Sequence, residues 1–199
     1  MSNSFDRLLE FVRFTHEIRE IERTIHFERD DHQENDAEHG YQLALTAWFL
    51  IENDKLSLDK FRCVGMALVH DVIEVYAGDL SAHLPEHRHP SRRLSEKQAV
   101  AKLKKRWPRF KSLHELIDEY EACKTSEAKF VYALDKLIPI INIYHYQGRS
   151  WRLLKLNLEQ MKAIKVGRVD ISPEIKKYYL SLIKLLEKHP ELFGQTKQL

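Results

Sequence analysis

The chain has 199 residues, of which 43% are hydrophobic and 31% are charged. This balance suits one domain with a sizeable core and solvated faces, so we expect a single domain over residues 1–199. Lys and Arg number 32 against 30 Asp and Glu, which leaves a net charge near +2. This charge gives no reason to expect binding to nucleic acid polymers or to a membrane surface, whereas small anions need only a local positive site.

The cysteine content and the apolar stretches favour a cytoplasmic protein. Cys63 and Cys123 lie far apart and in no CxxC spacing, which indicates neither a disulfide framework nor a zinc ribbon. Residues 1–7 show no signal peptide pattern. The longest apolar stretches, 44–51 and 137–143, are too short to span a bilayer.

The first part of the chain predicts helices separated by polar segments. Apolar residues recur at helical intervals over 4–23. The polar stretch 28–36 is expected to be a loop, and Asp36 is expected to cap a helix that runs to about residue 52. Ser57 is expected to cap a third helix, which is apolar up to residue 69.

The remainder is predicted to be helical as well. Residues 81–91 hold two Pro and three His and are expected to form an exposed loop. No stretch alternates with the period of a strand, so we expect an all-α fold. The helices are expected over 92–107, 113–123, 125–146, 151–163 and 173–188.

Ionisable residues interrupt the apolar pattern of three predicted helices. His70 and Asp71 follow an apolar helix, Asp135 lies on the apolar stripe of another, and His39 lies near the start of a third. A buried carboxylate is costly unless it is paired or bound to a metal. Two imidazoles and two carboxylates form a mixed ligand set that suits a borderline or hard divalent ion.

The same residues also have a structural interpretation. A single His on an apolar face is more often a hydrogen-bonded core histidine than a metal ligand. A single buried Asp more often caps a helix or pairs with an Arg, and the dipeptide His-Asp occurs often by chance. Spacing alone therefore leaves both interpretations open.

Three blocks of sequence change this balance. Residues 37–39 read AEH, residues 70–80 read HDVIEVYAGDL, and the EYE of 119–121 precedes EAKFVYALDKL at 127–137. In this order the blocks resemble the HD superfamily, and more closely its 5′-deoxynucleotidase branch, in which HDxxExxxGD is characteristic. The resemblance covers about residues 8 to 150.

The resemblance implies a helical HD-domain bundle that holds one divalent ion. The implied ligands are His39, His70, Asp71 and Asp135, and the ion is Mn, Co, Mg, Fe or Zn. It further implies a small-molecule nucleotide as substrate and a homodimer, for which residues after about 150 are a candidate interface.

Four further residues receive roles from the resemblance. Glu74 lies one helical turn after His70 and is expected to position or deprotonate the attacking water. Asp79 is a candidate proton donor to the leaving oxygen. Arg23, whose guanidinium suits phosphate oxygens, and Lys136 are candidates for binding the phosphate.

Each of these four residues also has a purely structural interpretation, and for Lys136 this structural interpretation is favoured over the functional one. The alternatives are a surface position for Glu74, a turn for Asp79, pairing of Arg23 with Glu20 or Glu22, and a solvated or paired Lys136. Likewise, Glu119 and Glu121 are expected to orient a ligand or to form ion pairs, and the histidines at 83, 87 and 89 to be solvated.

The chain also departs from the family pattern. Thr24 follows Arg23, where an aromatic residue is common, and Gly40 follows His39, where Ser is common. The connection between Arg23 and His39 is unusually acidic. These differences lie in the segments that we expect to contact the sugar and the base of the substrate.

The activity implied by the resemblance is metal-dependent hydrolysis of 2′-deoxynucleoside 5′-monophosphates to deoxynucleoside and phosphate. One alternative is an HD phosphohydrolase acting on a cyclic dinucleotide or on guanosine tetraphosphate. The first usually carries a GYP motif, but Gln42 follows Gly40-Tyr41 here, and the second usually reads HDxxED, but Val75 replaces the Asp. The other alternative is a catalytically silent nucleotide-binding sensor, which the complete ligand set disfavours.

Overall fold

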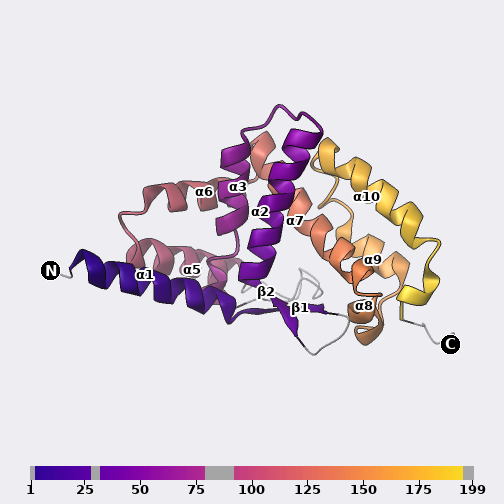
Figure 1. Ribbon diagram of the computed structural model, residues 1–199, viewed down its shortest axis with the longest axis horizontal. Coiled ribbons are helices and arrows are strands. Elements are labelled where there is room, and N and C mark those ends of the chain that lie inside the picture. The colour runs from indigo at the N-terminus through magenta and orange to yellow at the C-terminus, as the bar shows by residue number, and fades with distance from the viewer. Residues whose placement is uncertain (1–2, 28–31, 79–91, 195–199) are drawn as a thin grey trace.

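The computed structural model describes residues 3–27, 32–78 and 92–194. Helices dominate these residues, which confirms the all-α class (Figure 1). Asp79 and the histidine-containing loop predicted over 81–91 lie outside the described residues. The helices are α1 (Ser4–Arg19), α2 (Asp36–Asn53), α3 (Lys60–Val69), α4 (Glu74–Ala77), α5 (Arg92–Arg106), α6 (Lys111–Ala122), α7 (Ser126–His145), α8 (Arg149–Leu153), α9 (Leu158–Lys165) and α10 (Pro173–Leu186), followed by a 3₁₀ turn at Pro190–Leu192.

A short antiparallel hairpin follows α1. Its strands are β1 (Glu22–His26) and β2 (Gln33–Asn35), with Glu22 opposite Asn35. The predicted loop over 28–36 was therefore wrong at β2, and the helix predicted over 4–23 ends at Arg19. Strands of five and three residues are too short to show a clear alternation in sequence. The hairpin lies below the N-terminal end of α2 in Figure 1.

The centre of the molecule is built from α2, α3 and α7. Helix α7 is buried on most of its surface, as expected for a helix that is apolar nearly all round. In Figure 1, α1, α5 and α6 lie on one side of this centre and α8, α9 and α10 on the other. The central core includes Leu43, Ala47, Met66, Leu134 and Leu137.

A second apolar cluster joins α1 to α5 and α6. Phe14, Leu103 and Ile117 are buried there, and the Phe11 and Trp107 rings meet edge to face with centroids 5.2 Å apart. The Arg106 guanidinium donates to the Glu17 carboxylate at 2.7 Å. This cluster fixes α4, and therefore the segment that follows His70 and Asp71, against the end of α1.

Three predicted helix boundaries need correction. Asn35, rather than Asp36, caps α2, because its side chain accepts from the Glu38 amide at 3.0 Å while the Glu38 carboxylate accepts from the Asn35 amide at 3.1 Å. Asp59, rather than Ser57, caps α3. The helix predicted over 151–163 is two helices, because Asn157 forms the capping box that starts α9.

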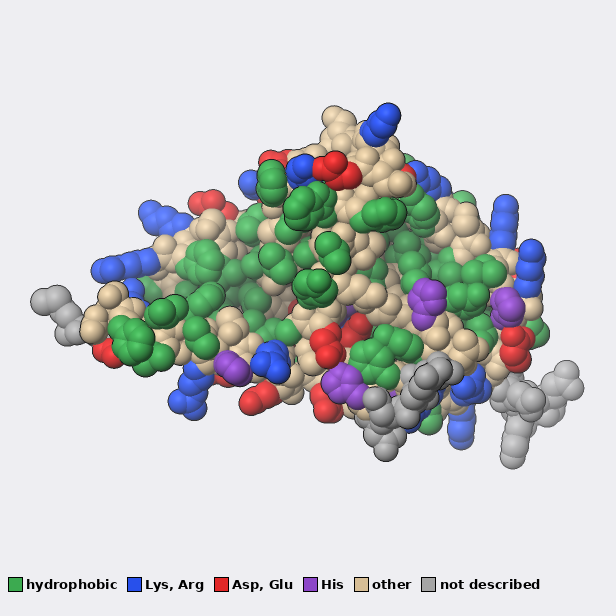
Figure 2. Space-filling model, viewed as in Figure 1, with side chains coloured by type: hydrophobic (Ala, Val, Ile, Leu, Met, Phe, Trp, Pro, Cys, Tyr) green, Lys and Arg blue, Asp and Glu red, His purple; other side chains and the backbone are tan. Residues whose placement is uncertain are grey.

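Large hydrophobic side chains remain exposed on part of the surface. Figure 2 shows hydrophobic side chains gathered over α1 and over the adjacent faces of α2 and α3. Those of α2 and α3 are Tyr41, Leu45, Trp48, Phe49, Phe61 and Leu68. Within the described residues, no helix combines the length and the apolar character needed to cross a membrane.

Candidate metal centre

His39 enters the centre from the first turn of α2. Its side chain is fully buried, and Nε2 lies 3.0 Å from Asp135 Oδ1. The capping box at Asn35 fixes the turn on which His39 sits. Burial and the nearby Arg23 lower the pKa of His39 to about 4, so the imidazole is neutral near pH 7 and has a lone pair to offer a metal.

His70 is the C-terminal capping residue of α3, and a backbone contact orients its ring. His70 Nδ1 lies 2.9 Å from the Ala67 carbonyl oxygen, which can only accept, so Nδ1 donates. In the neutral ring the lone pair then lies on Nε2, which is 2.9 Å from Asp71 Oδ2 and 3.8 Å from Asp135 Oδ1. Two carboxylates facing Nε2 favour a positive charge there, either a proton or a metal ion, and an Nδ1 that donates to a carbonyl is the usual arrangement of a metal-binding His.

The electrostatics at His70 agree with this geometry. Burial alone would lower its pKa, but the Asp71 and Asp135 carboxylates raise the pKa to about 10. A positive charge is therefore strongly favoured at Nε2. A divalent ion bound at Nε2 would supply this positive charge.

Asp135 lies in the middle of α7 and is held at both carboxylate oxygens. Oδ1 faces His39, while Oδ2 accepts from the Tyr120 hydroxyl at 2.8 Å and lies 2.6 Å from Lys136 Nζ. Burial opposes ionisation, but Lys136 and the two histidines hold the pKa of Asp135 well below its usual range. Ligand atoms of His39, His70 and Asp135 all lie within 4.8 Å of one another, so these three residues can hold a metal ion.

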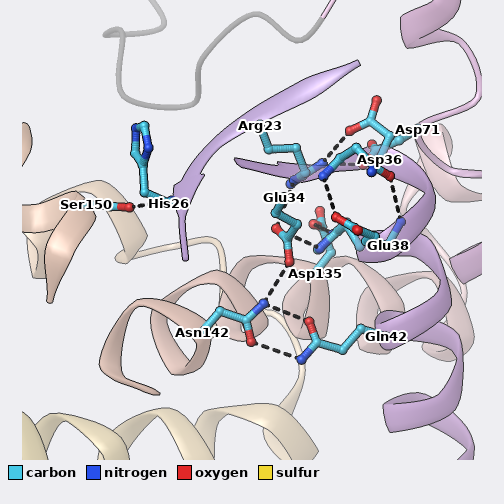
Figure 3. Close-up of polar contacts among 12 residues, drawn as sticks. Arg23, His26, Glu34, Asp36, Glu38, Gln42, Asp71, Asp135, Asn142 and Ser150 are labelled. Atoms are coloured by element: carbon cyan, nitrogen blue, oxygen red, sulfur yellow. Dashed lines mark hydrogen bonds and ion pairs between the residues drawn. The ribbon is translucent and has the colours of Figure 1, made fainter. Parts of the chain in front are cut away.

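Asp71 and Arg23 adjoin this group as a pair. Arg23 NH1 donates to Asp71 Oδ2 at 2.7 Å and to Asp36 Oδ1 at 3.0 Å, and Nε lies 3.5 Å from Glu34 Oε2 (Figure 3). From the sequence, Glu20 or Glu22 was the structural alternative as partner of Arg23. In the structure, the partners are instead Glu34, Asp36 and Asp71. Asp71 has a strongly lowered pKa, because His70 and Arg23 outweigh the cost of burial.

Several residues around the centre were not found from sequence. Glu34 is buried, with Oε2 3.8 Å from His39 Nδ1 and Oε1 accepting from Asn142 Nδ2 at 2.8 Å. Burial raises the pKa of Glu34 to about 7. Asp36 is buried as well. Glu34 lies on β2 and Asp36 begins α2, so the hairpin and the start of the helix that follows it bring both carboxylates to the centre.

The other predicted residues occupy different positions. Glu74 begins α4 and is half-buried, and its amide donates to the Asp71 carbonyl at 2.9 Å. Lys136 is paired with Asp135, which agrees with its structural interpretation.

In the EYE block, Glu119 forms an ion pair with Arg62 and accepts from Thr125 Oγ1 at 2.6 Å. The residue of this block that contacts Asp135 is Tyr120.

Two pockets flank the centre. The first, which we call the cationic pocket, is lined by Arg23, Lys136, Lys165 and Asp135 and by an apolar wall that includes Trp151. The second is lined by residues of α1, α2 and α3 together with His70 and Asp71. Thr24 lies in the wall of the cationic pocket and Gly40 in that of the second, so both departures from the family pattern fall at a pocket.

Comparison with known proteins identifies the family. The model of the HD domain family matches residues 15–176. The chain belongs to the HD domain family. This HD domain is 33% identical over 145 residues to the 5′-deoxynucleotidase HDDC2 of Homo sapiens, covering 70% of this chain and 68% of that protein. It is 32% identical over 121 residues to the 5′-deoxynucleotidase hdd1 of Schizosaccharomyces pombe, covering 58% and 60% of the two chains.

Solved structures share the fold. A protein from Magnetospirillum magnetotacticum, described as a "Predicted metal-dependent phosphohydrolase", superposes with a TM-score of 0.79 at 24% identity over 96% of both chains. A conserved hypothetical protein from Pyrococcus furiosus gives a TM-score of 0.63 at 19% identity over 90% of this chain and 99% of its own. The HD domain implies a divalent metal, and the group of His39, His70 and Asp135 fits one. The chain is accordingly a metal-dependent phosphohydrolase.

Proposed function

We propose that this HD domain hydrolyses 2′-deoxynucleoside 5′-monophosphates to a deoxynucleoside and inorganic phosphate. The observation that carries the proposal is the convergence of His39, His70 and Asp135 on one point beside a pocket that contains three cationic side chains. Such a pocket suits the dianion of a phosphate monoester, and its apolar wall suits a nucleoside. Relatives at about this chain's length are named 5′-deoxynucleotidases.

The metal ligands in this proposal are His39, His70, Asp71 and Asp135, and the ion is Mn, Co, Mg, Fe or Zn. When bound, such an ion polarises a phosphoryl oxygen and lowers the pKa of a coordinated water. Around it, Tyr120 and Lys136 hold Asp135 in place, and Glu34 lies behind His39. Outer contacts of this kind commonly tune metal affinity by roughly 10–100-fold.

The remaining groups bind the substrate and move protons. Arg23 and Lys136 hold the phosphate oxygens and offset the charge that builds on them. Glu74 orients the attacking water and takes its proton, and Asp79 gives a proton to the 5′ oxygen as the phosphorus–oxygen bond breaks. The water oxygen thereby joins the phosphorus, and the deoxynucleoside leaves as an alcohol.

A substrate panel tests the proposal. Phosphate release is measured from the five common 2′-deoxynucleoside 5′-monophosphates and from their ribose counterparts, with Asp71→Ala as the inactive reference. The expected result is turnover of the deoxy substrates, weak turnover of the ribose substrates, and loss of both in the variant. Equal activity on the two sugars, or none on either, contradicts the proposal.

The same assay decides between the alternatives. Turnover of a cyclic dinucleotide or of guanosine tetraphosphate, without turnover of the monophosphates, would indicate a different HD phosphohydrolase. Nucleotide binding without turnover of any substrate would indicate a sensor. We favour the deoxynucleotidase over both, because His39, His70 and Asp135 form a group that can hold a metal ion and the named relatives are 5′-deoxynucleotidases.

We also propose that the protein is a homodimer. The support is the exposed apolar surface of α2 and α3, where Trp48 and Phe61 meet edge to face at 6.4 Å. Apolar surface of this kind is typical of protein interfaces. Light scattering is expected to give the mass of two chains for the wild type and of one chain for Trp48→Asp. A monomeric wild type contradicts the proposal.

Two smaller proposals concern the chain as a whole. We propose a single domain, because α6 contributes to both apolar clusters, and we expect one cooperative transition in calorimetry. Two resolved transitions would contradict the single domain.

We propose a cytoplasmic location, because Cys63 and Cys123 are both free thiols. Cell fractionation that recovers the protein elsewhere would contradict that location.

A further inference from the structure

Lys165, the last residue of α9, is a buried lysine in the wall of the cationic pocket. Only 9% of its surface is exposed, and Arg23, Lys136 and Asp135 line the same pocket. Lysine is almost never buried unless its ammonium is paired, because desolvating the charge is costly. The position of Lys165 therefore needs an explanation.

The fold itself supplies no partner for this ammonium. Within the described ranges, the side chain of Lys165 forms no hydrogen bond and no ion pair, whereas Lys136 is paired with Asp135 and Arg23 with three carboxylates. Lys162, one turn earlier on the same helix, is paired with Glu159 at 2.9 Å and Glu187 at 3.0 Å. Lys165 is thus the cation of the pocket whose charge no carboxylate of the described chain meets.

The charges around Lys165 have the sign expected for an anion site. Burial lowers the pKa of Lys165 to about 7, and Lys136, Arg168 and Arg23 lower it too, while Asp135 acts in the opposite direction. Arg23 and Lys136 are already paired with carboxylates, so the unmet positive charge lies at Lys165 itself. An anionic group bound next to Lys165 would supply the missing partner.

We propose that Lys165 binds the phosphate group of the substrate, together with Arg23 and Lys136. This role rests on the proposed function and extends the phosphate site to α9, a helix on which the sequence analysis placed no site residue. A lysine ammonium is a compact point charge that suits a phosphate oxygen. Lys165, Asp135 and Trp151 line the same pocket, so a phosphate bound there would lie near a metal ligand and near an apolar wall that suits a nucleoside.

Binding of inorganic phosphate to the purified full-length protein tests the role without any need for turnover. Isothermal titration calorimetry compares the wild type with Lys165→Met, with Lys165→Arg and with the matched control Lys162→Met. Loss of one charge-assisted contact is expected to weaken phosphate binding roughly 10–100-fold in Lys165→Met. Lys165→Arg should retain most of the affinity, and Lys162→Met should equal the wild type. Unchanged affinity in Lys165→Met, or no measurable phosphate binding by the wild type, overturns the proposal.

A second measurement on the wild type covers the case in which a variant does not fold. Acetic anhydride acylates accessible neutral amines, and mass spectrometry reads Lys165 and Lys162 in the same sample. Inorganic phosphate is expected to protect Lys165 and to leave Lys162 unaffected. Equal acylation of Lys165 with and without phosphate overturns the proposal.

The two levels of the proposal fail differently. If phosphate binding depends on Lys165 but no deoxynucleotide is hydrolysed, the phosphate site stands and the proposed substrate is wrong. If deoxynucleotides are hydrolysed and Lys165→Met changes neither KM nor phosphate affinity, the enzyme stands and the role of Lys165 is wrong.

Discussion

The Arg23 guanidinium donates to Asp71 Oδ2 at 2.7 Å, and the same oxygen lies 2.9 Å from His70 Nε2. Arg23, which is proposed to bind phosphate, and His70, which is proposed to bind the metal, thus contact the same oxygen of Asp71. The same NH1 of Arg23 also donates to Asp36 Oδ1 at 3.0 Å, and Glu34 Oε2 lies 3.5 Å from Nε of the guanidinium. The position of Arg23 is therefore set by the same residues that surround the metal centre.

Substitution of Arg23 by Lys should separate these two roles. Lysine keeps the positive charge among the carboxylates but loses the planar fork that binds phosphate through two nitrogens. We expect KM for a deoxynucleoside monophosphate to rise about tenfold, with the metal content unchanged, as measured by steady-state kinetics and elemental analysis. Arg19→Lys, at an exposed position of α1, is the control. Unchanged KM in Arg23→Lys would remove Arg23 from the phosphate site.

Metal binding should stabilise the fold through the buried ligand group. A divalent ion that binds only the folded state contributes about 2.7 kcal/mol at 100 times its Kd, which raises Tm by about 5–10 °C in a chain of this size. We expect this shift when Mn²⁺ or Zn²⁺ is added to EDTA-treated wild type, and its loss in Asp135→Asn. Asp118→Asn, an exposed position paired with Lys104, should keep the shift. A full shift in Asp135→Asn would place the ion elsewhere.

The cap of α2 should affect the metal as well as the helix. Asn35→Ala removes the capping box next to His39 and is expected to cost about 1 kcal/mol of stability. Because His39 lies on the capped turn, metal affinity should also fall, by roughly tenfold. Asn157→Ala removes the equivalent capping box of α9 and should cost similar stability with unchanged metal affinity. Calorimetric titration of both variants checks this, and equal metal affinities would contradict the link.

Stability should depend on pH through Lys165. The folded protein has a pKa of about 7 for this group, against 10.5 in the unfolded chain, so the unfolded chain binds the extra proton between these values. Wild-type stability should therefore rise with pH from about 7 to 10.5. Lys165→Met should have the higher Tm near pH 7, by at least about 2–4 °C, and the difference should shrink as the pH rises to 10.5. A difference that is constant across this range would contradict the assignment.

The sequence predicted the helical class and most helix positions, because apolar spacing and caps are local signals. Asp135 was visible because a carboxylate on an apolar stripe conflicts with the pattern around it. The role of Glu34 could not be predicted from the sequence, because its burial depends on how the β1–β2 hairpin folds against α2 and α7. Lys165 was missed for the same reason: it is one of two lysines on a short helix, and only packing distinguishes it from Lys162, which is less buried.

The most direct test of the account is a metal titration of the EDTA-treated protein with phosphate release as the readout. Mn²⁺ is added in steps to wild type and to His70→Ala, with one 2′-deoxynucleoside 5′-monophosphate as substrate. The account predicts that wild-type turnover starts near zero and saturates with the metal, and that His70→Ala stays silent throughout. Turnover in EDTA equal to that with metal, or full activity in His70→Ala, would contradict a metal-dependent reaction at this centre.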